Sequence, residues 1–285
     1  ESPSAWFAEY ADVSIEERRY DFWGRFTPDA PDREAGRHPL TSYAAGKSLA
    51  FRWMLDNADR TIEISVHPHD DEQVVIVKQM PTDPAQELDA FAREDFWFLA
   101  LENLRRYLDG KGIIRCDYSQ PMLGDITHTI EIDAPVEAVY EALINPEQLN
   151  RWIASQATVE PQVGGVYDWG WGAGTEMKIV DLIPNERIEV HLAQTGQEGE
   201  SFGNVNTWTL EGSGGKTRLT LVHSGFAPDQ DTSGLNSGWL NFMSFIKSMT
   251  EYGAGWQPPV VRISEELIPF YAASIGKRQH ELLNR

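Results

Sequence analysis

Cysteine is almost missing from this sequence: Cys116 is the single one among 285 residues. A disulfide bond within the chain is therefore excluded, as is a zinc site built from several cysteine ligands. Such cysteine usage fits the reducing cytoplasm, so we predict a cytoplasmic protein. Cys116 itself is expected to serve as a small apolar side chain in a connecting segment.

Long hydrophobic runs and basic residues are also scarce. The sequence has no run of 18 apolar residues and shows no signal peptide, so no membrane span is predicted. The 24 lysines and arginines are outnumbered by 44 aspartates and glutamates, which gives a formal net charge of −20. Nucleic acids and anionic membranes both attract clustered positive charge, so neither is an expected partner.

Motifs that would indicate catalysis are missing too. There is no Gly-x-Ser-x-Gly elbow, no Walker loop and no Rossmann glycine fingerprint. Residues 67–71, His-Pro-His-Asp-Asp, have side chains that suit a metal, but they match a hairpin turn of the second half. We interpret them as a solvated hairpin. The sequence therefore predicts no cofactor and no metal, and it identifies no catalytic residue.

What is present is enough chain for two domains and an unusual number of tryptophans. Hydrophobic residues make up 41% of the sequence and charged residues 24%, as in ordinary globular proteins. Ten tryptophans occur. Such rings bury a large area and often line pockets for flat or apolar ligands, although they are also common as plain core side chains. Both interpretations stay open at this point.

The two halves of the chain show a faint internal repeat. Similar residues recur in the same order, with inward-facing positions at every second residue of the strands. The matches are Trp6 with Trp152, Tyr20 with Tyr167, Leu49–Trp53 with Ile188–Leu192, Val66 with Leu210, Val75 and Val77 with Leu219 and Leu221, Trp97 with Trp239, and Leu104 with Ile246.

The second half has the clearer pattern of elements. Residues 126–132 alternate with period two, which predicts a half-buried strand. Asp133-Ala134-Pro135 predicts a helix start with a capping acceptor, and Asn145-Pro146 predicts its end. A short helix to Trp152 follows. Further strands are expected near 156–160, 166–171, 175–183, 187–193, 203–211 and 216–223, and a long helix at about 235–253. We expect this helix to cover the concave face of a curved antiparallel sheet, with a cavity between them.

These patterns resemble the SRPBCC superfamily, which includes the START and birch-pollen-allergen types. The resemblance rests on residues 130–143, on Pro146 to Trp152, on Gly164-Gly165 and on residues 217–226. It is greatest for the branch named after the activator of the heat-shock-protein-90 ATPase. The resemblance implies an α+β fold with two tandem helix-grip domains, each a curved antiparallel sheet around a long C-terminal helix. Members of the superfamily bind lipids, hormones, polyketides or antibiotics, or act as protein partners.

We predict three segments. Residues 1–115 form an N-terminal domain that lacks its first strand and small helices, and residues 122–256 form a complete domain. Residues 257–285 read as an extended run, Pro258 to Ile263, and a helix from Ser264 to Leu283. This tail is hypothesised to patch the incomplete first domain.

Alternation along the strands of the second domain selects candidate ligand-binding residues, which share the faces expected to point into the cup. His128, Asn206 and His223 would be the polar groups in an aromatic pocket. An inward histidine is more often a satisfied core residue than a catalytic one. The candidates are His128, Trp152, Tyr167, Trp169, Trp171, Asn206, Trp208, His223, Trp239, Phe242, Met243 and Ile246.

The sequence is compatible with three hypotheses about function. The leading hypothesis is a bacterial protein that binds a hydrophobic, lipid-like or aromatic small molecule in a Trp-lined cavity, without catalysis. The second is a cyclase, aromatase or hydrolase in which His223 or His128 moves protons. The third is a chaperone accessory or another protein-interaction module. The sequence leaves the oligomeric state open, and a homodimer is compatible with it.

Overall fold

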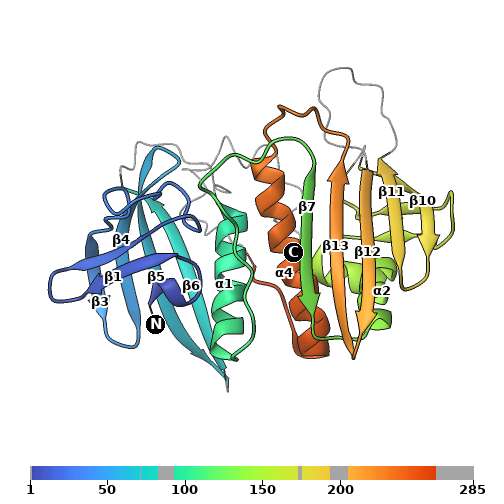
Figure 1. Ribbon diagram of the computed structural model, residues 1–285. Helices are drawn as coiled ribbons and strands as arrows, with labels where there is room; N and C mark the ends of the chain where they lie inside the picture. Colours follow the sequence, from blue (N-terminus) through green and yellow to red (C-terminus); the bar gives the residue numbers. More distant parts are fainter. Residues whose placement is uncertain (1, 71, 83–92, 173–174, 193–204, 261–285) are drawn as a thin grey trace. The chain divides into compact units, whose positions relative to one another are not determined.

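The computed structural model describes residues 2–70, 72–82, 93–172, 175–192 and 205–260 (Figure 1). The chain divides into two compact units, with the boundary between Gln120 and Pro121. Residues up to Gln120 are called unit 1, and residues Pro121–Pro259 are called unit 2. Among the described residues, no helix has the length and apolar character that crossing a lipid bilayer requires.

Unit 1 combines antiparallel strands with one long helix. Strands β1 and β2 form a two-stranded sheet, and β3, β4, β5 and β6 form a four-stranded sheet in that order. The elements are the 3-10 helix η1 (Pro3–Ala5), β1 (Tyr10–Ser14), β2 (Arg19–Trp23), β3 (Leu40–Ala44), β4 (Ser48–Leu55), β5 (Ala58–His69), β6 (Glu72–Pro81) and α1 (Glu94–Leu108).

The core of unit 1 is aromatic. Phe51, Trp53 and Leu55 occupy alternate positions of β4, and because successive side chains of a strand point to opposite faces, all three are buried on one face. Phe96 and Trp97 of α1 pack edge-on against Trp53, with ring centroids 5.6 and 6.0 Å apart. Helix α1 is therefore held to the sheet mainly by aromatic contacts.

Unit 2 is built around a seven-stranded antiparallel sheet with the order β7-β13-β12-β11-β10-β9-β8. Strand β7, the first of the unit, thus lies beside the last strand, β13. The elements are β7 (Ile126–Ile132), α2 (Val136–Ile144), α3 (Pro146–Trp152), β8 (Thr158–Val159), β9 (Val166–Asp168), β10 (Met177–Ile183), β11 (Arg187–Leu192), β12 (Val205–Ser213), β13 (Lys216–Ser224), α4 (Ser233–Tyr252) and the 3-10 helix η2 (Gly253–Gly255).

Helix α4 covers one face of this sheet. Trp239, one of its buried residues, has its ring centroid 5.6 Å from Trp208 of β12, and Figure 1 shows the helix running beside β7. The apolar stripe of α4, which includes Met243 and Ile246, is buried. The predicted fold class, a curved antiparallel sheet around a long C-terminal helix, is confirmed.

The predicted elements of unit 2 are found with small shifts at their ends. The strand expected over 166–171 stops at Asp168 because Gly170 follows with φ +71°, where a Cβ would lie 2.6 Å from the backbone oxygen of Gln156. The predicted capping role of Asp133 is wrong: Pro135 is the N-cap of α2 and no side chain caps that helix. Asn145 instead caps α3, accepting a bond from the Glu147 amide at 2.9 Å.

The two units share an order of elements. In each, a short helix is followed by six antiparallel strands and a long helix, from η1 to α1 in unit 1 and from α3 to α4 in unit 2. A difference lies at the sheet edge: β13 pairs with β7, whereas β6 pairs only with β5 among the described residues. A duplication as the origin of this likeness stays a prediction. The predicted tail elements fall mostly outside the described residues, which end at Val260.

Candidate functional site

The polar candidates lie on one face of the unit 2 sheet, in neighbouring rows. Asn206 of β12 is directly opposite His223 of β13. Leu221 lies two residues before His223 on β13. It is opposite Trp208 of β12 on one side and opposite His128 of β7 on the other side. Because side chains alternate along a strand, these five residues share the face that α4 covers. The sequence-based assignment of these faces therefore agrees with the observed register.

A hydrogen bond fixes the protonation of His223. The indole Nε1 of Trp239 donates to Nδ1 of His223 at 2.8 Å. An indole nitrogen can only donate, so Nδ1 must carry a lone pair and the proton of the neutral ring must sit on Nε2. His223 is 7% exposed, and Phe226 packs against its other side with ring centroids 4.7 Å apart. In this arrangement His223 is a neutral histidine held in one tautomer.

Aromatic rings form a continuous cluster beneath α4, which we call the aromatic cluster. Trp239 is its centre, with ring centroids 5.6 Å from Trp208, 5.9 Å from Trp169 and 6.2 Å from Phe242. Trp152 is also part of the cluster, with its ring centroid 6.2 Å from that of Trp208. Trp152, Trp169, Trp208 and Trp239 are all buried, so these four rings pack as core side chains in the structure.

The aromatic cluster reaches the surface at one end. Trp171 is 37% exposed and stacks on the half-buried Phe242, with centroids 5.6 Å apart and planes at 25°. Its ring also lies 4.7 Å from Trp169. The indole Nε1 of Trp171 donates to the carbonyl of Ile153 at 2.9 Å, which holds the ring in place. Trp171 and Phe242 are called the open end of the aromatic cluster.

The opposite end of the aromatic cluster is anchored to α2. The Trp152 indole donates to the carbonyl of Ala142 at 2.9 Å, and the Tyr167 hydroxyl donates to the carbonyl of Leu143 at 2.6 Å. Both acceptors are in the last turn of the helix, where carbonyls have no partner within the helix. Burial raises the pKa of Tyr167 well above its ordinary value, so this hydroxyl stays protonated. Tyr167 and Trp152 therefore serve packing and helix capping in the structure.

Several buried polar atoms under α4 have no hydrogen-bond partner among the described residues. They include Oδ1 of Asn206, Nε1 of Trp208 and Nε2 of His128. The amide nitrogen of Asn206 points to the sulfur of Met177 at 3.7 Å, a weak contact. Burial lowers the pKa of His128, which hydrogen bonding with Asn236 partly offsets. Buried groups without partners are costly, about 1–3 kcal/mol each, and are rare in native proteins.

Helix α4 is tied at its start to the segment before β7 and near its far end to β7 itself. At the start, Thr232 donates its amide to the carbonyl of Met122 and its hydroxyl to that of Gly124, both at 2.9 Å. At the far end, the ammonium of Lys247 bonds to Glu251 at 2.6 Å and to the carbonyl of Glu131. The first tie holds the segment that enters β7, and the second holds β7 itself near its end.

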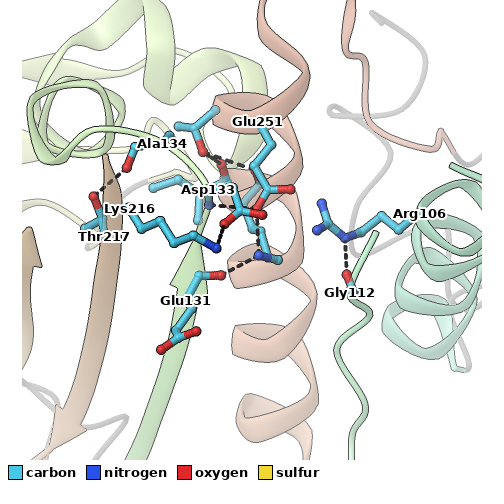
Figure 2. A network of polar contacts seen from close by, with 11 residues as sticks. Arg106, Gly112, Glu131, Asp133, Ala134, Lys216, Thr217 and Glu251 are labelled. Carbon is cyan, nitrogen blue, oxygen red and sulfur yellow. Dashed lines mark hydrogen bonds and ion pairs between the residues drawn. The ribbon is translucent and has the colours of Figure 1, made fainter. Parts of the chain in front are cut away.

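Figure 2 shows the second of these ties as a polar network. Glu251 also accepts the backbone amide of Asp133 at 3.0 Å, and Asp133 in turn pairs with Lys216 at 2.6 Å. The Glu251 side chain is fully buried and that of Lys247 nearly so. Asp133, expected to cap α2, is instead part of this network.

The structure contains two sets of polar contacts that the sequence-based prediction does not include. On β11, Glu189 accepts from Arg187 and bonds His191 at 2.9 Å; burial opposes the ionised form of Glu189, but these partners outweigh it and lower its pKa. This cluster alternates with the buried Ile188 and Val190, so it lies on the face away from α4. The positions of Arg187, Glu189 and His191 at every second residue of the strand were the signal in the sequence that could have indicated this cluster. Within the described residues, no three His, Cys, Asp or Glu side chains gather to hold a metal ion.

The second grouping is in unit 1, where His38 is buried in the aromatic core. Its Nε2 lies 3.2 Å from the carbonyl of Phe22, and its ring packs on the Phe22 ring at 4.0 Å. Burial lowers the pKa of His38 to about 4. His67 and His69, in contrast, lie on the β5–β6 hairpin, where His69 is opposite Glu72. The predicted hairpin is thus confirmed, apart from Asp71, which lies outside the described residues.

The sheet of unit 2, with two short helices after its first strand and a long helix across one face, has the helix-grip arrangement of SRPBCC proteins. Residues 133–251 match the family model described as activator of Hsp90 ATPase homolog 1-like protein. The resemblance predicted from the sequence is confirmed for this part of the chain.

Several solved structures are similar to the chain. The Aha1 dimer from Colwellia psychrerythraea is 27% identical, with a TM-score of 0.41, over 46% of this chain and 98% of that one. Protein MLL2253 from Mesorhizobium loti is 25% identical, with a TM-score of 0.38, over 44% and 96%. CalU16 from Micromonospora echinospora is 19% identical, with a TM-score of 0.39, over 58% and 98%. No curated protein matches the chain.

Proposed function

We propose that unit 2 binds a flat, hydrophobic or aromatic small molecule at the open end of the aromatic cluster. The observation that carries this proposal is the stacked pair of Trp171 and Phe242. What distinguishes this exposed indole is that it continues directly, through Trp169 and Phe242, into a cluster of buried rings. An aromatic ligand could stack on this pair and extend the row of rings by one member.

The polar groups deeper in the cluster would give such a site its selectivity. Asn206 and His128 each present a buried atom without a partner among the described residues, and Trp208 presents an unpaired donor. Small-molecule sites combine an apolar lining with a few convergent polar groups. We expect the preferred ligand to carry a hydroxyl or carbonyl group beside its rings, because a purely hydrocarbon ligand would leave these atoms unpaired.

A ligand screen with a matched variant tests the proposal. Thermal shift and native mass spectrometry of the full chain, with fatty acids, phenols and polycyclic aromatic compounds, should reveal a ligand that raises the melting temperature. Trp171→Ala should weaken its binding at least tenfold. Trp23→Ala is the control, because Trp23 stacks on Tyr10 in unit 1 with similar geometry, 5.8 Å and 25°. Equal loss in both variants, or no ligand in any class, would refute the proposal.

The family match favours a second candidate, a chaperone accessory that binds the heat-shock protein Hsp90 and stimulates its ATPase. The support is the match of residues 133–251 to the family described by that activity. The assay is the ATPase rate of purified Hsp90 with increasing amounts of the full chain. An unchanged rate together with no binding in analytical ultracentrifugation would dispose of this candidate.

A further inference from the structure

Strand β6 is an edge strand of the four-stranded sheet in unit 1. It is ten residues long, and residues 74–77 read Val-Val-Ile-Val. In the part of the chain that the structure describes, only β5 pairs with it. This pairing runs from Arg60 opposite Pro81 to His69 opposite Glu72 without a bulge, so the edge is continuous. A long apolar edge of this kind invites pairing with another strand.

One face of this strand carries Glu72, Val74, Ile76 and Lys78, because successive side chains of a strand point to opposite faces. All four side chains are exposed, Val74 by 40% and Ile76 by 38%. Along this face the strand therefore reads acidic, apolar, apolar and basic. The two charges stand at its ends and have opposite signs.

Two antiparallel copies of β6 are complementary when a two-fold axis passes through Val75. Each residue is then opposite the one that lies equally far from Val75 on the other copy. Glu72 is thus opposite Lys78 of the second copy, and Val74 is opposite Ile76 of the second copy. Opposite charges and apolar pairs directly across two strands stabilise a sheet. Each pair occurs twice, because a two-fold interface uses the same surface on both copies.

Other positions of the axis lose this match. With the axis at Ile76, Lys78 is opposite Val74, and with the axis at Val74, Glu72 is opposite Ile76. Either shift by one residue therefore places a charge against an apolar side chain. Pro81, which has no amide hydrogen to donate, lies outside the stretch 72–78 that is paired when the axis is at Val75.

We propose that the edge of β6 is a dimer interface, at which a second copy of this chain adds its own β6 in the antiparallel register centred on Val75. The two four-stranded sheets would then form one continuous sheet. A strand of an unrelated protein would match this charge pattern only by chance, whereas β6 matches it by itself.

The expected dimer is weak and reversible. Each copy carries a formal net charge of −20, so two copies repel each other at long range, and the two Glu72–Lys78 contacts offset this repulsion locally. Pairing along a single edge also covers less surface than a standard protein interface. Dimerisation is therefore best measured over a range of protein concentrations at physiological salt, where long-range repulsion is screened.

Charge reversal in the full chain tests the pairing. Glu72→Lys places lysines opposite each other and Lys78→Glu places glutamates opposite each other, so each variant should raise the dissociation constant at least tenfold in sedimentation velocity. An equimolar mixture of the two variants has opposite charges at both contacts and should restore the dimer. Glu16→Lys makes the same charge change at an exposed residue between β1 and β2 and should leave the dimer intact.

A single introduced cysteine tests the register. Val75→Cys, in a Cys116→Ala background, places the two cysteines directly opposite each other. Their Cα atoms would be about 4.5–5.5 Å apart, within the range of a disulfide bond. Mild oxidation should then give a covalent dimer on a non-reducing gel. Val77→Cys is the control, because it replaces the same residue type on the same face but lies opposite Gln73; it should not cross-link.

The remaining outcomes overturn the proposal. A chain that stays monomeric, with fast deuterium exchange at the outward amides of β6, would show that the edge is left unpaired. A monomer in which these amides are protected would show that another part of the same chain covers the edge. A dimer that persists in both charge variants, or equal cross-linking at positions 75 and 77, would place the interface elsewhere.

Discussion

Trp239 of α4 and His223 of β13 are joined by an indole-to-imidazole hydrogen bond of 2.8 Å inside the aromatic cluster. Trp208 is nearby on the same sheet face, but its indole nitrogen has no partner in the described part of the chain. The two tryptophans thus offer a matched comparison between a bonded and an unbonded buried donor.

Trp239→Phe should destabilise the protein by about 1 kcal/mol more than Trp208→Phe, because only the first removes a hydrogen bond and leaves His223 without its donor. Chemical denaturation followed by circular dichroism measures the difference. Equal losses in the two variants would mean that the bond contributes nothing beyond ring packing.

The buried His38 predicts a pH dependence of unit 1. Its pKa is about 4 in the folded state and about 6.5 in the unfolded chain. As the pH falls below 6.5 the unfolded state takes up the proton first, so stability is lost progressively down to about pH 4. The loss should reach about 3 kcal/mol, from about 1.4 kcal/mol for each unit of difference.

Denaturation at pH 7, 5.5 and 4 of the native chain and of His38→Gln measures this loss. The variant should be less stable at pH 7 but show a shallower pH profile. Because two units can unfold separately, near-ultraviolet circular dichroism and nuclear magnetic resonance of the His38 ring serve as local probes. A His38 ring that titrates near pH 6.5 would contradict the prediction.

The Lys247–Glu251 pair should be far more sensitive to the loss of one partner than of both. Lys247→Met leaves the fully buried Glu251 without its cation, and about 3 kcal/mol of stability should be lost. Lys247→Met with Glu251→Gln should recover part of that loss, since no charge is then left unpaired. A double variant no better than the single one would show that the two charges are not coupled.

Cys116 should resist modification until the protein unfolds. It is 3% exposed, and burial raises the pKa of its thiol to about 11, so little reactive thiolate is present at pH 8. Reaction with a thiol reagent should be at least 100-fold slower than in denaturant. Rapid labelling of the native chain would show that this connecting segment opens frequently.

Periodicity was sufficient to predict the strands of unit 2 and the faces of Asn206, His223 and His128, because a strand has only two faces. It could not predict the hydrogen bond between Trp239 and His223, which depends on side-chain rotamers from elements far apart in sequence. The spacing of Lys247 and Glu251, four residues apart on a helix, was a usable signal. His38 gave none, since it lies in an irregular segment just before β3.

The ties of α4 limit how a ligand could reach the sheet beneath it. Thr232 and Lys247 hold the helix to the segment that enters β7 and to β7 itself. Arg151 of α3 adds a third tie, because its guanidinium donates to the carbonyl of Gly253, directly after the helix, at 2.7 Å. With α4 held from both sides, a ligand at the open end of the aromatic cluster would be accommodated by the side chains of Trp171 and Phe242 rather than by a movement of the helix.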